Sequence, residues 1–186
     1  ISIEVCYSSV NYKDALSASG SKAVTREYPH VPGIDAAGTV LASTDSNFAV
    51  GDEVVVTGYD LGMNTAGGFG QQVTVPGGWV TKLPVGLSLR DSMVLGTAGL
   101  TAGLCVNKLL LNGITPEAGK VLVTGATGGV GIIACALLVK LGFEVVASTG
   151  KLAETAKLTA LGVSEVISRE AFSQENPRTM LKESYA

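Results

Sequence analysis

Apolar and polar residues alternate along the first half of the chain, and residues typical of turns interrupt the alternation often. Residues 1–7 place Ile1, Ile3, Val5 and Tyr7 on one face, as expected for a half-buried strand. Further short strands are predicted at 34–42, 53–57, 71–75 and 79–83. Many short strands with turns between them indicate a small β-barrel-like domain.

A short helix interrupts this β pattern. Residues 11–16 carry the helical pattern, and Ser8, Ser9 or Asn11 is suited to cap it. The glycine-rich stretch 62–70 predicts a loop, either a mobile loop of an active site or simply a long turn.

The second half changes to longer apolar runs. Residues 88–91 resemble a helix start, and 96–111 predict an apolar helix rich in small residues. Strands are expected at 121–124, 144–148 and 165–168, with a helix at 132–141 that Gly142 ends. The order predicts an α/β chain with a β domain at 1–95 and a nucleotide-binding domain at 96–186.

A glycine cluster joins the 121–124 strand to the helix that follows. Residues 126–131 read Ala-Thr-Gly-Gly-Val-Gly, which matches the dinucleotide fingerprint G-x-G-x-x-G except for alanine at its first position. Gly128 would let the backbone approach a pyrophosphate at the helix N-terminus, and Gly131 would let the helix pack closely on the strand. The alternative is a tight strand–helix turn without a ligand.

The end of the second strand of this unit indicates which dinucleotide binds. NAD sites usually hold an acidic residue there, about 20 residues after the glycines, for the ribose hydroxyl. Residues 148–151 are Ser-Thr-Gly-Lys, which offer two hydroxyls and a cation instead. A 2′-phosphate would attract Lys151 and accept hydrogen bonds from the hydroxyls, so NADP(H) is predicted. The alternative is that Lys151 merely faces solvent.

Composition narrows the functional class. A net charge of −3 over 186 residues, with scattered cations, gives no basic surface for nucleic acid. Three cysteines far apart favour buried thiols in a reducing compartment over a disulfide framework. We expect no membrane-spanning segment and no signal peptide, and therefore a cytoplasmic protein. Only the first half of a doubly wound domain is recognisable, so we expect the sequence to be a fragment of a longer enzyme.

Five motifs in this order resemble the medium-chain dehydrogenase/reductase superfamily, and specifically its YhdH/YhfP quinone-oxidoreductase branch, which includes acrylyl-CoA reductases. They are Asn-Tyr-Lys-Asp at 11–14, Pro-Gly-Ile-Asp-Ala-Ala-Gly at 32–38, Gly-Asp-Glu-Val at 51–54, Gly-Thr-Ala-Gly-Leu-Thr-Ala at 96–102 and Val-Thr-Gly-Ala-Thr-Gly-Gly-Val-Gly at 123–131. The resemblance implies a partial GroES-like β-barrel catalytic domain, the first half of a Rossmann domain, and a homodimer acting on a small-molecule substrate.

The same resemblance shows what is missing for zinc chemistry. The zinc alcohol dehydrogenases of the superfamily use a cysteine and a histidine where this sequence has Asn11 and Ile34, and a glutamate where it has Asp35. Neither asparagine nor isoleucine can supply the ligands that catalytic zinc requires. A lone His30 beside a proline turn favours a structural role, so no metal is expected.

Without a metal, the economical reaction is hydride transfer from NADPH to an activated C=C bond, with the protein supplying orientation and donors. The resemblance assigns catalysis to Asn11, Tyr12 and Asp14, with Tyr12 as cofactor contact or proton donor and Asp14 as an orienting group. The predicted cofactor residues are Tyr12, Thr97, Thr101, Thr127, Gly128, Gly129, Val130, Gly131, Ser148, Thr149, Gly150 and Lys151. A quinone reductase and a non-catalytic NADP(H)-binding protein remain as alternatives.

Overall fold

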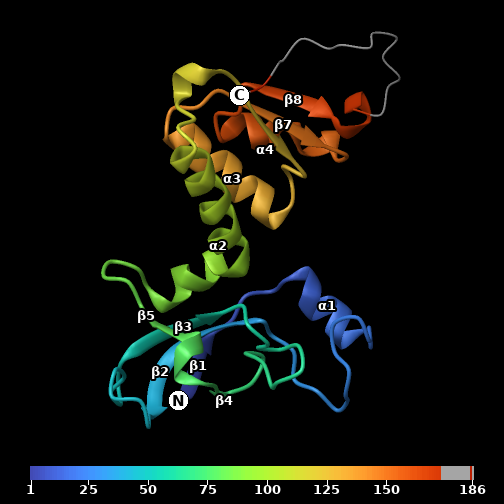
Figure 1. The fold of residues 1–186 in the computed structure, drawn as a ribbon. Helices are drawn as coiled ribbons and strands as arrows, with labels where there is room; N and C mark the ends of the chain where they lie inside the picture. The colour runs from blue at the N-terminus through green and yellow to red at the C-terminus, as the bar shows by residue number, and fades with distance from the viewer. Residues whose placement is uncertain (173–184, 186) are drawn as a thin grey trace. The chain divides into compact units, whose positions relative to one another are not determined.

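The computed structural model describes residues 1–172 and Tyr185 (Figure 1). It forms two compact units, Ile1–Thr97 and Ala98–Ala186, called here the N-terminal and C-terminal units. Together they make a mixed α/β chain, in agreement with the predicted fold class.

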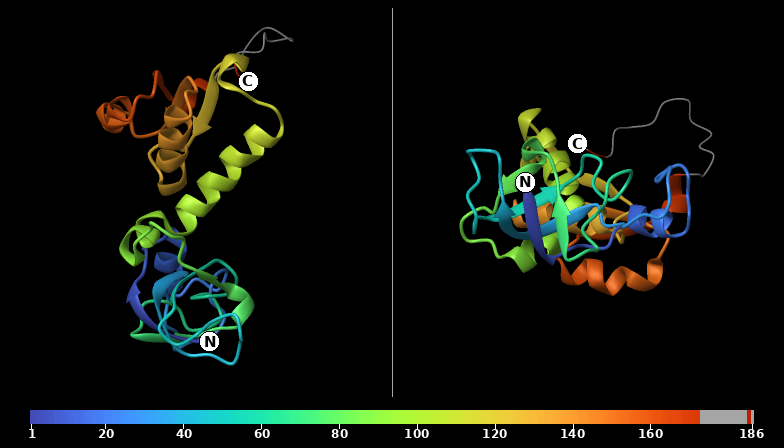
Figure 2. Two further views of the ribbon diagram at one scale, coloured as in Figure 1. Left: turned by 90° about the vertical axis from the view of Figure 1, so that its left-hand side faces the viewer. Right: turned by 90° about the horizontal axis from the view of Figure 1, so that it is seen from below.

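The N-terminal unit is built on a five-stranded antiparallel sheet of order β4-β1-β2-β3-β5. The strands curve around the core of the unit (Figure 2). Their bounds are Ser2–Tyr7 (β1), Asp35–Ala42 (β2), Glu53–Thr57 (β3), Gln72–Thr74 (β4) and Val80–Lys82 (β5), and the short helix α1 spans Tyr12–Ala18.

Period-2 patterning sets which face of this sheet is buried. Ile3, Val40 and Val56 are almost completely buried and belong to one apolar cluster, whereas Glu4 and Leu41, the next residues along β1 and β2, are exposed. A one-residue shift in register would turn these side chains to solvent, so the core fixes the pairing.

The glycine-rich loop is packed backbone against backbone onto the segment that leads into β2. The amide of Gly67 donates to the carbonyl of Val31, and the amide of Gly68 donates to the carbonyl of Gly33, each at a distance of 2.8 Å. A Cβ added to Gly68 would lie only 2.2 Å from the carbonyl oxygen of Asp35. Of the two interpretations left open by the sequence, these contacts favour a long packed turn over a mobile loop.

Helix α2, Leu89–Leu111, crosses from the first unit into the second and is broken at Gly96, whose φ and ψ are 49° and −153°. Its length and mean hydropathy of 1.5 are enough for a membrane span, which corrects the expectation that no segment reaches this length. The break leaves an uninterrupted helix of about 15 residues, or roughly 22 Å, against a hydrocarbon thickness of roughly 30 Å. We therefore interpret α2 as a helix of a globular protein.

The C-terminal unit holds a three-stranded parallel sheet of order β6-β7-β8, with strands Val121–Thr124, Val145–Thr149 and Glu165–Ser168. Helix α3, Gly129–Lys140, follows β6, and α4, Thr155–Ala160, precedes β8 (Figure 1). Short 3₁₀ turns lie at Gly77–Trp79, Pro116–Ala118, Leu152–Glu154 and Arg169–Phe172. Val106 of α2, Leu138 of α3 and Val145 of β7 share the core of this unit.

The cysteines differ from the sequence expectation. Cys135 is buried on α3, but Cys6 and Cys105 are exposed. Cys6 points outward because it occupies an outward position of β1, and Cys105 lies on a face of α2 that the described residues leave open. The prediction of three buried thiols is therefore wrong for two of them.

Candidate active site

Asp35 lies at the start of β2 and is fully buried. Its carboxylate accepts hydrogen bonds from three residues of the N-terminal unit. Its Oδ2 accepts hydrogen bonds from the hydroxyl of Ser9, from Nδ2 of Asn11 at 3.0 Å and from the backbone amide of Thr97 at 2.9 Å. Its Oδ1 accepts the hydroxyl of Thr97 at 2.6 Å. Four donors around one carboxylate satisfy its charge without a cation, which is how a buried acid is tolerated.

The break in α2 makes this arrangement possible. The φ and ψ of Gly96 lie in a region that is essentially restricted to glycine. A Cβ at Gly96 would also lie 2.7 Å from Oδ2 of Asp35. The break at Gly96 directs the backbone amide of Thr97 at the carboxylate of Asp35.

Asp14 is a second buried carboxylate, and it is engaged entirely by backbone amides. Its Oδ2 accepts the amide of Asn11 at 2.7 Å, across the N-terminus of α1. Its Oδ1 accepts the amides of Gly33 and Ile34 at 3.1 and 2.9 Å. Asp14 thus caps the helix and ties it to the turn before β2, as a residue that orients its neighbours would.

The predicted catalytic residues fall into two groups. Asn11 lies within the Asp35 network, where Nδ2 donates to Oγ of Ser9 at 2.8 Å as well as to Asp35. Both amide hydrogens are therefore directed at protein oxygens. Tyr12, by contrast, is 79 % exposed at the first position of α1. Of these residues, Tyr12 presents its hydroxyl to solvent, and Asn11 and Asp14 hold the structure beside it.

The glycine turn of the C-terminal unit has the geometry of an anion site. Gly128 is the N-cap of α3 and offers no side chain to cap the first amides of the helix. These amides have no partner within the helix, and they point out of its N-terminus. A Cβ at Gly131 would lie 2.4 Å from the carbonyl oxygen of Gly125, so only glycine allows the helix to approach the strand this closely.

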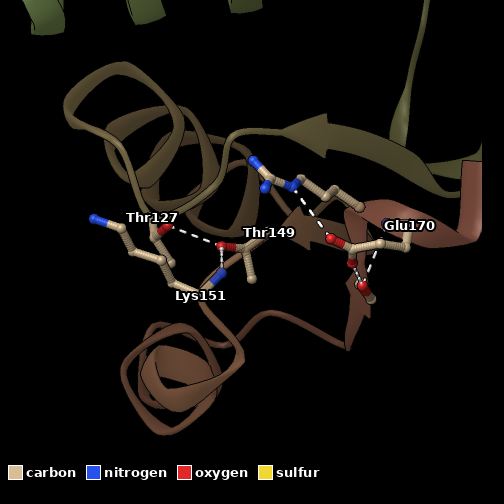
Figure 3. A network of polar contacts seen from close by, with 6 residues as sticks. Thr127, Thr149, Lys151 and Glu170 are labelled. Carbon is tan, nitrogen blue, oxygen red and sulfur yellow. Dashed lines mark hydrogen bonds and ion pairs between the residues drawn. The ribbon is translucent and has the colours of Figure 1, made fainter.

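A pocket of about 630 Å³ opens at the carboxyl ends of the parallel strands, beside this turn. Thr149 is buried there, and its hydroxyl exchanges a hydrogen bond of 2.9 Å with that of Thr127 and accepts the amide of Lys151 at 2.9 Å (Figure 3). The Thr149 hydroxyl is therefore used in holding the turn. The side chain of Lys151 remains as a cationic group of the pocket.

Sequence reasoning missed three residues of this pocket: Thr124, Gly125 and Arg169. Thr124 ends β6, and Gly125 begins the glycine turn. Arg169 follows the last residue of β8, and the parallel pairing of β7 with β8 brings these strand ends together. The signal that reveals it is the rule that ligands bind at the carboxyl ends of parallel strands.

The remaining predicted cofactor residues lie on two different helices. Gly129 and Val130 belong to the first turn of α3, while Thr101 lies on α2 in the C-terminal unit. The described geometry groups most of the predicted cofactor residues around β6, β7 and α3, and groups Asn11 and Thr97 around Asp35 in the other unit.

Comparisons with known proteins indicate the family. Residues 1–85 match the family described as the alcohol dehydrogenase GroES-like domain. The putative quinone oxidoreductase YhfP of Bacillus subtilis is 55 % identical over 90 % of this chain and 51 % of its own length. Acrylyl-CoA reductase AcuI of Ruegeria pomeroyi is 45 % identical over the whole chain and 56 % of its own length.

Solved structures show the same architecture. The YhdH oxidoreductase of Salmonella enterica in complex with NADP superimposes with a TM-score of 0.94 at 46 % identity, over 99 % of this chain and 56 % of that one. Bacillus subtilis YhfP with NAD bound gives a TM-score of 0.94 at 50 % identity, over 100 % and 56 %. The chain belongs to the medium-chain dehydrogenase/reductase superfamily.

Within that superfamily the chain falls in the zinc-independent quinone oxidoreductase and acrylyl-CoA reductase group, and it spans about half the length of the curated relatives it matches. The two positions that correspond to zinc ligands have other uses here. Asn11 donates to Asp35, and Ile34 is buried and donates its backbone amide to Asp14. His30 contacts the carbonyl of Gly62 at 2.9 Å, which places it against the glycine loop. Residues 1–172 contain no cluster of three potential metal ligands.

Proposed function

We propose that the protein is an NADPH-dependent reductase of activated C=C bonds in α,β-unsaturated carbonyl compounds, with acrylyl-CoA as the first substrate to test. One observation carries the cofactor assignment. Among the described residues, the pocket at the carboxyl ends of the parallel strands is lined by Lys151 and by no carboxylate, as a 2′-phosphate requires. The acrylyl-CoA reductases among its relatives support the reaction class.

The residues present fit the cofactor. The uncapped amides at the N-terminus of α3 suit a pyrophosphate, since they combine free donors with the positive end of the helix dipole. Exposed Gly128 lets a phosphate come close to the backbone. When bound, NADPH supplies the hydride that adds to the carbon β to the substrate carbonyl.

The proposed role of Tyr12 is to donate a proton to the α carbon, where the electron pair of the former C=C bond is taken up. Its hydroxyl is exposed and lies next to the Asp35 network in sequence. Asn11 and Thr97 both donate to the carboxylate of Asp35, so the segments that carry them are held at the start of β2. Asp14 holds α1 in place through backbone amides and takes no part in proton transfer.

Quinone reduction is the second candidate, and one comparison favours it: the relative at 55 % identity is named a putative quinone oxidoreductase. Both reactions use the same cofactor pocket and differ in the acceptor of the hydride. A protein that binds NADP(H) without turnover is the third possibility, and it predicts cofactor binding with no acceptor-dependent oxidation.

The decisive experiment measures NADPH oxidation by the purified protein with acrylyl-CoA, with a para-benzoquinone, and with propionyl-CoA as the saturated control. Oxidation with acrylyl-CoA alone supports the proposed reaction, and formation of propionyl-CoA identifies the bond reduced. Faster oxidation with the quinone favours the second candidate. Binding of NADPH without oxidation by either acceptor would leave only the non-catalytic interpretation.

A companion titration tests the cofactor assignment. Lys151→Ala should weaken NADPH binding about tenfold, corresponding to about 1.4 kcal/mol, and leave NADH binding unchanged. Lys157→Ala is the matched control, because Lys157 is paired with Glu154 at 2.5 Å on the neighbouring helix and does not line the pocket. Equal affinity of the unchanged protein for NADPH and NADH would contradict the assignment.

A further inference from the structure

Arg169 lies directly against Gly150 at the open end of the cofactor pocket. The parallel pairing aligns Thr149 with Ser168, so the residues that follow them, Gly150 and Arg169, come side by side. A Cβ added to Gly150 would lie 2.9 Å from both Cζ and Nε of Arg169. The guanidinium therefore occupies the space that any side chain at position 150 would need.

The present partner of Arg169 is a carboxylate of its own turn. Nε of Arg169 donates to Oε1 of Glu170 over 3.3 Å. The other oxygen of Glu170 accepts the hydroxyl of Ser168, which anchors the carboxylate to the end of β8. The side chains of Arg169 and Glu170 are 74 % and 65 % exposed. An ion pair this exposed is weak and easily exchanged for a stronger anion.

Lys151 approaches the same pocket from another direction. Lys151 and Glu170 lie on opposite sides of Thr149 (Figure 3). Within residues 1–172, the pocket lining includes no carboxylate, and its cations are Arg169 and Lys151. A guanidinium can bind a phosphate through two parallel hydrogen bonds, whereas an ammonium acts as a point charge. Arg169 would therefore contribute directional hydrogen bonds, and Lys151 would contribute charge.

We propose that Arg169 is a second residue that selects for the 2′-phosphate, that Gly150 provides the space in which it lies, and that Glu170 occupies the guanidinium until the phosphate displaces it. The inference rests on the proposed function, because it assumes that the pocket receives an adenine dinucleotide. It adds to that function a specificity determinant and an internal competitor, both contributed by the turn after β8.

Substitution of Gly150 provides the sharpest test. The backbone of Gly150 has no positive φ, and the three atoms nearest to an added Cβ all belong to the flexible side chain of Arg169. Gly150→Ala should therefore fold normally and displace the guanidinium. It should weaken NADPH binding by about the same factor as Arg169→Met, about tenfold, and leave NADH binding within about twofold of the unchanged protein.

The double variant completes the test. If Gly150→Ala acts only by moving Arg169, the two changes together should weaken NADPH binding no more than either alone. The minimal probes are adenosine 2′,5′-bisphosphate and AMP, whose affinities isolate the 2′-phosphate from the rest of the dinucleotide. Full additivity of the two losses would overturn the role given to Gly150.

Glu170→Gln tests the internal competitor. The change keeps the size of the side chain and removes its charge, so NADPH affinity should rise about threefold at low salt, with the gain disappearing as salt screens the ion pair. Glu165→Gln is the control, because Glu165 lies at the other end of β8 and pairs with Lys120. Unchanged NADPH affinity in Glu170→Gln would overturn the competitor.

The remaining outcomes separate this inference from the proposed function. If Arg169→Met weakens NADPH and NADH binding equally, Arg169 contacts the adenine and does not select for the phosphate. If the unchanged protein prefers NADPH and Arg169→Met keeps that preference, the inference fails and the proposed function stands. If the unchanged protein binds neither dinucleotide, both fail.

Discussion

Asp35 and Thr97 are joined by two hydrogen bonds, one from the amide of Thr97 at 2.9 Å and one from its hydroxyl at 2.6 Å, across 62 positions of sequence. The carboxylate of Asp35 is thereby fixed to the residue at which the chain leaves the N-terminal unit. Since Asn11 donates to the same carboxylate, one buried charge sets the positions of two residues on distant segments.

Replacing Asp35 with asparagine should destabilise the protein by about 2 kcal/mol. The NH₂ group of the asparagine is a hydrogen-bond donor, and it would face the donors of Ser9, Asn11 or Thr97 without an acceptor between them. Urea denaturation of the N-terminal unit would detect the loss. Asp45→Asn is the control, because Asp45 accepts the amide of Asn47 at 2.9 Å in a surface turn, where water can replace a lost bond. Equal effects of the two changes would contradict the importance given to burial.

Tyr12→Phe should lower kcat for the unsaturated substrate about a hundredfold while leaving the affinity for NADPH unchanged, since general acid catalysis contributes about 10²–10⁴-fold. The fold should be unaffected because Tyr12 is 79 % exposed. Steady-state kinetics combined with NADPH titration separates the two effects. Tyr59→Phe, which alters another exposed tyrosine, should change neither quantity. An unchanged kcat in Tyr12→Phe would assign the proton to solvent.

Gly128→Ala and Gly131→Ala should separate cofactor binding from stability. A Cβ at Gly131 meets fixed backbone at 2.4 Å, so that variant should lose about 3 kcal/mol of stability. A Cβ at Gly128 meets only the Gly125 carbonyl oxygen, at 3.2 Å, so that variant should fold and bind NADPH about tenfold more weakly. Thermal unfolding and NADPH titration measure the two effects. Similar stability losses in both variants would argue against distinct roles.

The three thiols should differ in reactivity. Burial raises the pKa of the Cys135 thiol to about 11, and Cys6 and Cys105 are exposed. At about pH 8, Ellman's reagent should label Cys6 and Cys105 rapidly, and Cys135 only after denaturant is added. Cys6→Ser and Cys105→Ser should each remove one rapid equivalent. Rapid labelling of all three thiols would contradict the burial of Cys135.

The same pKa gives the sign of a pH effect. The folded state retains the Cys135 proton where the unfolded chain, with a pKa of about 8.5, has lost it. The stability due to this difference is complete below about pH 8.5 and falls as the pH rises towards 11. Cys135→Ala should show a shallower decline over that interval in denaturant titrations. An identical decline in both proteins would contradict the raised pKa.

Local patterns predicted most of the fold because local rules determine it. The strands Glu53–Thr57, Val121–Thr124 and Glu165–Ser168 begin and end where the sequence placed them, since alternation and flanking turn residues mark them. Helix α3 begins at Gly129 instead of residue 132, because Gly129, Val130 and Gly131 already form its first turn, after the extended N-cap Gly128. Sequence alone gives no sign of this, since glycine disfavours helices.

The contacts that the sequence did not reveal are between distant residues. The meeting of Asp35 with Thr97 depends on the unusual backbone of Gly96, and that of Gly150 with Arg169 depends on the order of the parallel strands. The sequence separation within each of these two pairs follows no helical or strand periodicity, so no pattern in the sequence indicates the contact. Motif matching therefore located the glycine turn between β6 and α3, while the carboxylate network and the position of Arg169 required the three-dimensional structure.

The packed glycine loop has a consequence for how this protein can change by mutation. At Gly33, Gly62, Gly67 and Gly68, the space of a side chain is already filled by the backbone of the opposing segment. Between them, Asn64, Thr65 and Ala66 are exposed. A library randomised across the whole loop would consist mostly of unfolded variants, whereas one confined to residues 64–66 would retain the fold. New binding specificity at this surface is therefore accessible through three adjacent positions set within a rigid frame.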